Sequence, residues 1–169
     1  MLLKRITIVS AIIILAAGLS SNRAYTPAPE LKWYTDLNEV HTISQKTKKP
    51  IFGFFTGSDW CGWCMKLQRD VFAKEAFKVW ANKYVVLLEL DFPKRTPQSD
   101  ALRQQNQNLA QGFQIQGYPK VWLFKTDKDS VKNHFNITPY GSLGYPVGAE
   151  VGKEEVTFLK TANGILGIK

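Results

Sequence analysis

The chain of 169 residues contains two cysteines, Cys61 and Cys64, which lie three positions apart in the motif Trp60-Cys61-Gly62-Trp63-Cys64. The motif follows a short apolar stretch that we expect to be a buried strand, and it opens a segment that we expect to be a helix. A thiol at a helix N-terminus faces free backbone N–H groups and the positive end of the helix dipole, which lower its pKa. This placement predicts thiol–disulfide exchange.

The positions of the two cysteines predict different roles. Cys61 occupies the first turn of the expected helix and should be the attacking thiolate. Cys64 lies one turn deeper and should resolve the mixed disulfide that Cys61 forms with a substrate. Trp60 and Trp63 flank the pair, so we expect them to shield it and to offer apolar surface to an unfolded partner.

An inert disulfide and a zinc half-site are the competing interpretations of the cysteine pair. A loop of four residues would remove little chain entropy, because disulfide stabilisation by this mechanism grows with loop length. His41 and His134 are distant in sequence and lack metal-ligand spacing. We therefore expect a redox-active pair, no metal site, and no cofactor besides the Cys61–Cys64 disulfide itself.

The formal net charge of +8 could indicate nucleic acid or an anionic membrane as a partner. The lysines are dispersed along the chain, however, with the densest group at Lys46, Lys48 and Lys49. No basic stripe is interleaved with aromatic residues in the way that nucleic-acid-binding proteins show. We expect a solvated cationic surface and no nucleic-acid partner.

The N-terminus has the pattern of a secretory signal peptide. Lys4 and Arg5 precede an apolar stretch at residues 6–19, and small residues follow. This stretch would span about 21 Å as a helix, which is short of a bilayer core of about 30 Å. We assign residues 1–20 to a signal peptide, with an uncleaved membrane anchor as the alternative. Residues 21–32 should form a flexible leader, and residues 33–169 the working domain.

Strands and helices alternate along that domain. Helices are expected at 37–47, 61–72, 74–82, 99–112 and 153–163, and strands at 50–56, 84–92, 121–125 and 130–137, with the last two strands paired as a hairpin. In the final helix, Val156, Leu159 and Ala162 should face inward, and the glycine-containing residues 141–152 should form a loop. Alternating elements imply parallel strands joined by crossovers, and the hairpin adds an antiparallel edge. The pattern predicts a three-layer α/β domain with a central mixed sheet flanked by helices.

A second element, Gly117-Tyr118-Pro119, directly precedes the strand at 121–125. A proline at the start of a strand can have a cis peptide bond, which fixes a tight turn. Spacing alone makes this only a weak indication.

These two elements together resemble the thioredoxin fold, with WCGWC in the place of the family's active-site motif and Tyr118-Pro119 at its cis-proline loop. The segments KKPIFGFFTGSDWCGWCMKLQ, LELDFPK and LRQQNQNL resemble, more narrowly, exported thioredoxin-like oxidoreductases. The resemblance covers most of residues 33–169. It implies a periplasmic thiol–disulfide oxidoreductase that acts as a reductase rather than an oxidant.

The resemblance also implies the site and the partners. Tyr118-Pro119 should pack against the cysteine pair and present backbone to the substrate chain. The expected substrate-binding residues are Trp60, Gly62, Trp63, Tyr118 and Pro119. Disulfide-containing exported proteins are the expected substrates, and a membrane-embedded protein the expected electron donor. Nothing marks a dimerisation domain, so we expect a monomer.

One position departs from the family pattern. Many thioredoxins have a buried aspartate six residues before the first cysteine, and Phe55 stands there in this chain. The lysine that usually faces this aspartate is replaced by an apolar residue of the 84–92 strand, about Leu87. Asp59 could substitute in proton transfer, or it could cap a loop.

Two other functions remain open at this point. An exported chaperone-like binding module could use Trp60, Trp63 and Tyr118 to hold unfolded chains, and its action would survive loss of both thiols. A disulfide isomerase is chemically adjacent to a reductase, although isomerases of this kind rely on a dimerisation domain that nothing in the sequence marks.

Overall fold

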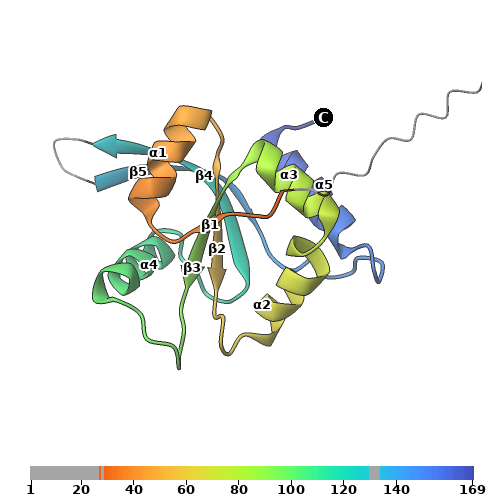
Figure 1. Cartoon of the computed structure of the whole chain (residues 1–169), viewed down its shortest axis with the longest axis horizontal. Helices are drawn as coiled ribbons and strands as arrows, with labels where there is room; N and C mark the ends of the chain where they lie inside the picture. Colours follow the sequence, from red (N-terminus) through yellow and green to blue (C-terminus); the bar gives the residue numbers. More distant parts are fainter. Residues whose placement is uncertain (1–26, 28, 130–133) are drawn as a thin grey trace, which may run out of the picture.

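A five-stranded mixed sheet with strand order β1-β3-β2-β4-β5 forms the middle layer of the computed structural model (Figure 1). The structure describes residues 27, 29–129 and 134–169. The predicted signal peptide, most of the predicted leader and residues 130–133 of the predicted hairpin lie outside the described residues. The elements in chain order are β1 (Trp33–Tyr34), α1 (Leu37–Thr47), β2 (Ile51–Thr56), α2 (Gly62–Leu67), η1 (Gln68–Phe72), α3 (Glu75–Tyr84), β3 (Val86–Asp91), α4 (Asp100–Gly112), β4 (Lys120–Asp129), β5 (His134–Leu143) and α5 (Glu154–Leu166).

The strand β2 lies at the centre of the sheet. It pairs in parallel with β3, from Ile51 opposite Val86 to Thr56 opposite Asp91, and antiparallel with β4. All six of its residues are buried. Both faces of β2 are covered, so apolar and polar residues do not alternate along it as they do in a strand with one face in water. This explains why the sequence IFGFFT is almost continuously apolar.

Helices cover both faces of the sheet and divide the core in two. The first core cluster lies under α2, η1, α3 and α5, and contains Cys61 and Cys64 with Phe52, Phe54 and Leu87. The second lies under α1 and α4, and its members include Leu37, Val40, Phe55, Leu90, Leu109, Phe113 and Phe124. Figure 1 shows these two helical layers on either side of the strands. The predicted three-layer α/β architecture is confirmed.

The helix that follows the cysteine motif differs from the expected continuous helix at 61–72. After α2 the chain forms a π-helical turn, η1, in which the Ala73 N–H donates to the Gln68 carbonyl at 2.8 Å. A π turn accommodates one extra residue. As a result Val71 and Phe72 are both buried in the first core cluster.

The C-terminal third departs from the sequence expectation in the ends of its elements and in the buried face of α5. The strand β4 continues to Asp129 and α5 to Leu166, beyond the expected ends at 125 and 163. The strand β5 continues to Leu143, so Gly141 lies in a strand and not in the predicted loop. A Cβ at Gly141 would lie 3.0 Å from Ile165 Cγ2, so glycine allows α5 to pack closely on β5. In α5, Val156 is 56% exposed, contrary to the expected inward face, and Phe158 is buried in its place.

The structure also adds contacts near the start of the domain. The short strand β1, which the sequence did not predict, pairs in parallel with β3. The last residues of the predicted leader contact α3, because Asn82 Nδ2 donates to the Pro29 carbonyl at 3.0 Å and Lys78 pairs with Glu30 at 3.0 Å. Within the described residues, no helix has both the length and the apolar composition needed to span a bilayer.

Candidate active site

Cys61 and Cys64 form a disulfide at the start of α2, with an S–S distance of 2.05 Å and a Cα–Cα distance of 5.2 Å. Cys61 is the N-cap of the helix, and its Sγ accepts a hydrogen bond from the Cys64 N–H at 3.2 Å. This N–H belongs to the first turn, where no carbonyl four residues earlier lies within the helix, and it is shared between the sulfur and the Cys61 carbonyl, which accepts it at 3.0 Å. The sequence therefore places the first sulfur where backbone N–H groups can stabilise a negative charge.

The two sulfurs differ in accessibility. Cys61 is 5% exposed, whereas Cys64 has no exposed surface and is enclosed by the first core cluster. Between them, a Cβ added at Gly62 would meet no atom within 4 Å, so the surface over Gly62 is open. The exposed part of the pair is therefore on the side of Cys61.

Trp60 is held in place from several directions. Its indole N–H donates to the Phe92 carbonyl at 2.7 Å, and its ring meets Tyr118 edge-on with centroids 5.6 Å apart. The ring lies directly over Gly57, where a Cβ would come within 2.4 Å of the indole. Lys94 Nζ lies 4.2 Å from the ring centroid. With 36% of its surface exposed, Trp60 offers a fixed apolar face beside Cys61.

Trp63 is the more exposed tryptophan, at 56%, and contacts Tyr145 with ring centroids 5.2 Å apart. Tyr145 in turn donates to Asp70 at 2.9 Å, and Lys66 donates to both Tyr145 and Asp70. The hydrogen bond from Lys66 lowers the pKa of Asp70, and the same bond raises the pKa of Lys66. Sequence reasoning missed this cluster, because Tyr145 lies in a loop with no pattern that links it to α2.

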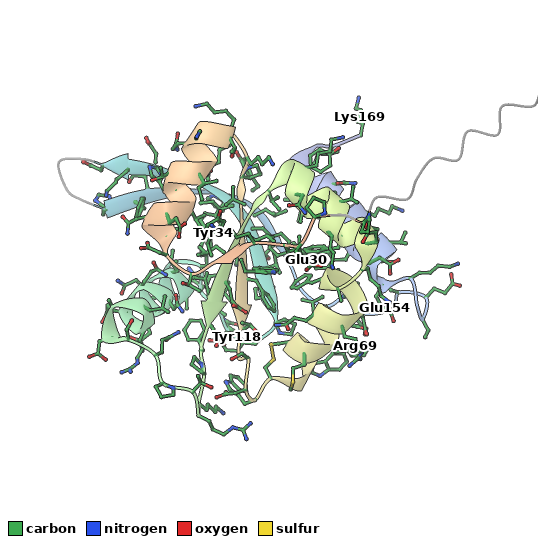
Figure 2. The ribbon with its side chains drawn as sticks, viewed as in Figure 1. Glu30, Tyr34, Arg69, Tyr118, Glu154 and Lys169 are labelled. Atoms are coloured by element: carbon green, nitrogen blue, oxygen red, sulfur yellow. A yellow bond between two sulfur atoms is a disulfide. The ribbon has the colours of Figure 1, made fainter. Side chains whose placement is uncertain are left out.

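The Tyr118–Pro119 peptide bond is cis, as the position of the motif in the thioredoxin fold implies. Tyr118 is half-buried, and this burial raises the pKa of its hydroxyl. Figure 2 shows Tyr118 at the same end of the molecule as the disulfide. The loop after β5 runs beside the cis-proline loop, since a Cβ at Gly144 would lie 3.4 Å from the Pro119 carbonyl oxygen. Of the predicted residues, Trp60, Gly62 and Trp63 adjoin the cysteines in the chain, and Tyr118 contacts Trp60 and packs against the core cluster that contains both cysteines.

Asp59 binds the loop that follows β3. Its carboxylate accepts hydrogen bonds from three consecutive backbone N–H groups, those of Lys94, Arg95 and Thr96, at 2.6–3.0 Å. These bonds, that of Lys94 above all, lower the pKa of Asp59 to about 2. The Arg95 guanidinium also donates to the Asp59 carbonyl. This geometry favours the loop-capping role of Asp59 over the proton-transfer role.

Phe55 packs in the second core cluster, on the opposite face of the sheet from the cysteines. The neighbouring residue, Phe54, lies in the same cluster as Cys64, so the cysteine side of β2 presents an aromatic ring and no carboxylate. Leu87, the residue expected to replace the family's lysine, also lies on the cysteine side. Opposite Phe54 on β3 is Glu89, which the sequence reasoning did not single out. Burial, with a smaller contribution from the Asp91 charge, raises the pKa of Glu89.

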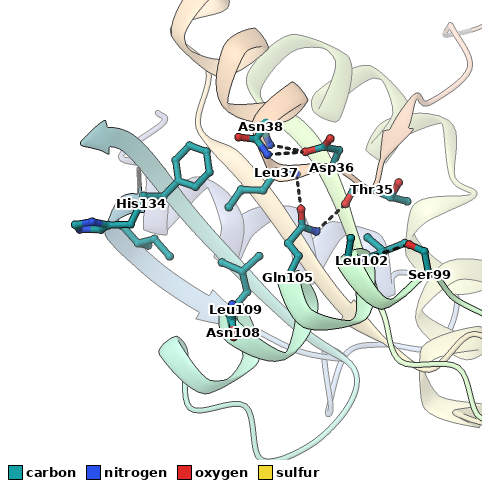
Figure 3. A pocket seen from close by; sticks show the side chains of 13 residues that line it. Thr35, Asp36, Leu37, Asn38, Ser99, Leu102, Gln105, Asn108, Leu109 and His134 are labelled. Atoms are coloured by element: carbon teal, nitrogen blue, oxygen red, sulfur yellow. Dashed lines mark hydrogen bonds between the residues drawn. The ribbon is translucent and has the colours of Figure 1, made fainter. Parts of the chain in front are cut away.

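A pocket of about 710 Å³ lies elsewhere, between the start of α1, α4 and β5 (Figure 3). Gln105 bridges its wall by accepting from the Leu37 N–H and donating to the Thr35 carbonyl, both at 2.8 Å. None of the predicted site residues lines it. The cysteine pair instead lies on a surface with exposed aromatic side chains, which suits a polypeptide substrate better than a small molecule.

Comparisons with known proteins agree with this geometry. The family profile of the thioredoxin-like domain matches residues 37–156. A disulfide bond reductase, DsbH, from Chlamydia pneumoniae is 37% identical over 118 residues, which cover 70% of each chain. A thioredoxin-related protein, DsbJ, from the same organism is 30% identical over 71% of this chain and 33% of its own length.

Solved structures show the same fold. A DsbH oxidoreductase superposes with a TM-score of 0.69 at 26% identity, covering 85% of this chain and 89% of its own. A thioredoxin from Thermus thermophilus superposes with a TM-score of 0.54 at 15% identity, covering 80% of this chain and 87% of its own, which is a likeness of fold alone.

Proposed function

The chain belongs to the thioredoxin-like family and is a thiol–disulfide oxidoreductase, and from this premise we propose that it reduces disulfide bonds in exported proteins. The observation that supports this most directly is the asymmetric cysteine pair. Cys61 lies at the rim of the domain on the N-cap of α2, and Cys64 is fully buried one turn behind it. Such a pair has one sulfur for attack and one for resolution.

The reaction consists of two exchanges. The Cys61 thiolate attacks one sulfur of the substrate disulfide, forming a mixed disulfide and releasing the other substrate sulfur as a thiolate, which takes up a proton. The Cys64 thiol loses its proton and attacks Cys61 Sγ, which releases the second substrate thiol and forms the Cys61–Cys64 disulfide. Two electrons pass from the pair to the substrate, and an electron donor must then reduce the pair again.

Backbone hydrogen bonding favours Cys61 as the nucleophile. The Cys64 N–H that donates to Cys61 Sγ at 3.2 Å in the disulfide is available to the same sulfur when it is a thiolate. Hydrogen bonds to a charged acceptor are stronger than those to a neutral one. The helix N-terminus should therefore hold the pKa of Cys61 below that of a free thiol.

The aromatic residues at the site supply the surface for a substrate chain. Trp60 with Tyr118, and Trp63 with Tyr145, form two ring pairs, one beside each cysteine of the motif. The cis-proline loop would present its backbone to an extended substrate chain next to Cys61. The exposed rings would bind apolar side chains near the substrate's disulfide.

The reductase direction, the periplasmic location and a membrane-embedded electron donor are parts of this proposal. The direction is supported by the relative named a disulfide bond reductase, which is 37% identical. The location is supported by the signal-peptide pattern at residues 1–20. A donor in the membrane would supply electrons to a compartment that lacks a soluble reducing pool.

Serine variants of the two cysteines test the proposal in an insulin-reduction assay. Cys61→Ser should abolish turnover, and Cys64→Ser should accumulate mixed disulfides that gel electrophoresis without reductant detects. Val79→Ser, at an exposed position of α3, is the matched control and should retain turnover. Full activity in both cysteine variants would refute the proposal.

The equilibrium reduction potential in glutathione buffers tests the direction separately. A potential of about −230 to −270 mV, the range of glutaredoxins and thioredoxin, would support a reductase. A potential near about −120 mV would make the protein a disulfide donor and overturn the proposed direction, while leaving the exchange chemistry intact.

A chaperone-like function is a second candidate, because Trp63 and Met65 expose apolar surface beside the pair. Suppression of aggregation that persists in the Cys61→Ser, Cys64→Ser double variant would support it. Loss of suppression in that variant would argue against it.

A further inference from the structure

We propose that the end of the domain opposite the cysteine pair binds the surface of an anionic phospholipid bilayer. A pocket of about 430 Å³ at this end is surrounded by four lysines: Lys48, Lys49, Lys83 and Lys125. The remaining lining residues are Pro50, Tyr84, Tyr140, Ile165, Leu166 and Ile168. We refer to these ten residues as the basic end. The proposal is independent of the redox function.

The fold gathers these lysines from separate elements. Lys48 and Lys49 follow α1, Lys83 lies in the last turn of α3, and Lys125 lies on β4. The C-terminal half of α5 and the residues after it supply the aliphatic part. Figure 2 shows Lys169, the residue after Ile168, at one end of the molecule, and Tyr118 at the other.

No aspartate or glutamate is among the described residues that line this pocket. Lys83 and Lys125 lie over tyrosine rings, 4.8 Å from the centroid of Tyr84 and 5.8 Å from that of Tyr140. Lys49 Nζ donates to the Asn82 carbonyl at 2.6 Å. These contacts orient the ammonium groups without neutralising them, so the basic end keeps its positive charge for an external anion.

The apolar part of the basic end distinguishes a bilayer from a small soluble anion. Ile165, Leu166 and Ile168 are half-buried, and Tyr140 is exposed. Lysines that extend past apolar surface while their charge stays in water, with tyrosines beside them, match the interface between lipid headgroups and acyl chains. A free phosphate would contact the lysines alone and leave the exposed parts of these aliphatic side chains and of Tyr140 in water.

The charge is large enough to have a measurable effect. Each lysine next to an anionic leaflet contributes an attraction that corresponds to roughly a fivefold gain in partitioning. Three lysines together should therefore change partitioning by roughly 100-fold. Because the motif lies at the far end of the sheet, a domain bound in this way would keep Cys61 directed away from the lipid.

Lysine acetylation of the full chain in the presence of vesicles tests the proposal residue by residue. The vesicles are phosphatidylcholine alone, or phosphatidylcholine with one-third phosphatidylglycerol. Mass spectrometry should show slower acetylation of Lys48, Lys83 and Lys125 with the anionic vesicles than with the neutral ones. Lys74 and Lys153, which precede α3 and α5 at the ends remote from the pocket, should react equally with both.

Two matched triple variants test whether these lysines cause the binding. Lys48→Gln, Lys83→Gln, Lys125→Gln should remove most of the excess of binding to anionic over neutral vesicles. This ratio cancels the contribution of the apolar residues 6–19, and Lys4 and Arg5 contribute equally to the native chain and to both variants. The control variant, Lys74→Gln, Arg103→Gln, Lys153→Gln, removes the same charge from other surfaces and should keep most of the excess. Thermal unfolding confirms that both variants fold.

Three results would overturn the proposal. Uniform protection of all lysines, or equal loss of binding in both triple variants, would show only the attraction of net positive charge to an anionic surface. Protection of Lys48, Lys83 and Lys125 by glycerol phosphate alone, without a vesicle effect, would show a site for a soluble anion. None of these results would change the outcome of the insulin-reduction assay, so the membrane-binding proposal and the proposed reductase function can be refuted independently of each other.

Discussion

At the scale of single residues, Asp59 is a carboxylate near the reactive cysteine that stabilises the conformation of a loop. Three backbone N–H groups of the loop after β3 donate to it, and they lower its pKa to about 2. A carboxylate with that pKa stays ionised through the range in which thiols exchange, so it has no proton to give there. Its interactions fix the loop that holds Phe92, the acceptor for Trp60.

We predict that Asp59→Asn lowers the melting temperature at pH 7 by several degrees. A lowered pKa means that the ionised form stabilises the fold above the ordinary value of 3.8, and that this stabilisation disappears as the pH falls toward about 2. The difference between the variant and the native chain should therefore shrink in acid. Thermal unfolding from pH 7 down to about pH 2 measures it. A variant with the native melting temperature but an altered pH–rate profile would instead support proton transfer by Asp59.

Gly57 supports a second prediction at the scale of single residues, because the absence of a side chain leaves room for the Trp60 indole. A Cβ would come within 2.4 Å of that ring, which the Phe92 carbonyl and Tyr118 hold in place. Gly57→Ala should therefore displace Trp60, shift its indole N–H resonance and raise the KM for insulin. Gly112→Ala, where a Cβ meets nothing within 4 Å, is the control. An unchanged Trp60 resonance in Gly57→Ala would contradict the contact.

The cysteine chemistry could be predicted from the sequence because it depends on neighbours in the chain. Cys61, Cys64 and the start of α2 are local features, and the structure places them as expected. The side of the sheet that Phe55 faces could not be predicted in the same way. A shift of one position along a strand moves a side chain to the other face, and only the pairing with β3 fixes that choice.

At the scale of elements, the long apolar strands and amphipathic helices were predictable, and the short or irregular elements were not. The strand β1 has two residues, too few for any periodicity, and forms because β3 offers a free edge to Trp33 and Tyr34. The π turn η1 depends on how Val71 and Phe72 pack in the core, which the helical spacing of the sequence does not reveal.

The end of α4 supports a prediction of its own. Gln114 adopts a left-handed conformation with φ of 52°, directly after the C-cap. Its N–H donates to Gln111, and the next N–H, of Ile115, donates to Ala110, which is the Schellman pattern. Glycine adopts this conformation without the penalty of a Cβ.

We predict that Gln114→Gly stabilises the fold by about 0.5–1 kcal/mol, and that Gln114→Val destabilises it by at least about 1 kcal/mol. Urea unfolding measures both changes, provided that the slope of the unfolding free energy against urea concentration is the same in the variants and the native chain. Lower stability of the glycine variant, or equal stability of the two variants, would show that the left-handed conformation is not retained in solution.

At the scale of the whole molecule, the dispersed lysines of the sequence become an organised surface. Lys48, Lys83 and Lys125 are separated by more than thirty positions in the chain, yet they line one pocket. No pattern in the sequence could show this, because the gathering depends on where α1 and α3 end and on the register of β4. The sequence predicts a solvated cationic surface, and the fold adds that these three lysines share one pocket on it.

The two ends of the domain should act independently. The strand β2 runs from Ile51, next to the pocket residue Pro50, to Thr56 near the cysteine motif. Six extended residues span about 20 Å, more than twice the Debye length of about 8 Å at physiological salt. Charges at the basic end should therefore be screened from the reacting sulfurs.

We predict that Lys48→Gln, Lys83→Gln, Lys125→Gln changes kcat/KM for insulin reduction by less than about twofold, because screening at this distance leaves little electrostatic effect on Cys61. Conversely, Cys61→Ser should retain the acetylation pattern of the native chain on anionic vesicles. Stopped-flow reduction assays at low and physiological salt, with the charge-matched triple variant as the control, measure the first effect. A tenfold loss of kcat/KM at physiological salt, in a variant that unfolds at the native temperature, would mean that the two ends are coupled through the sheet and not merely through charge.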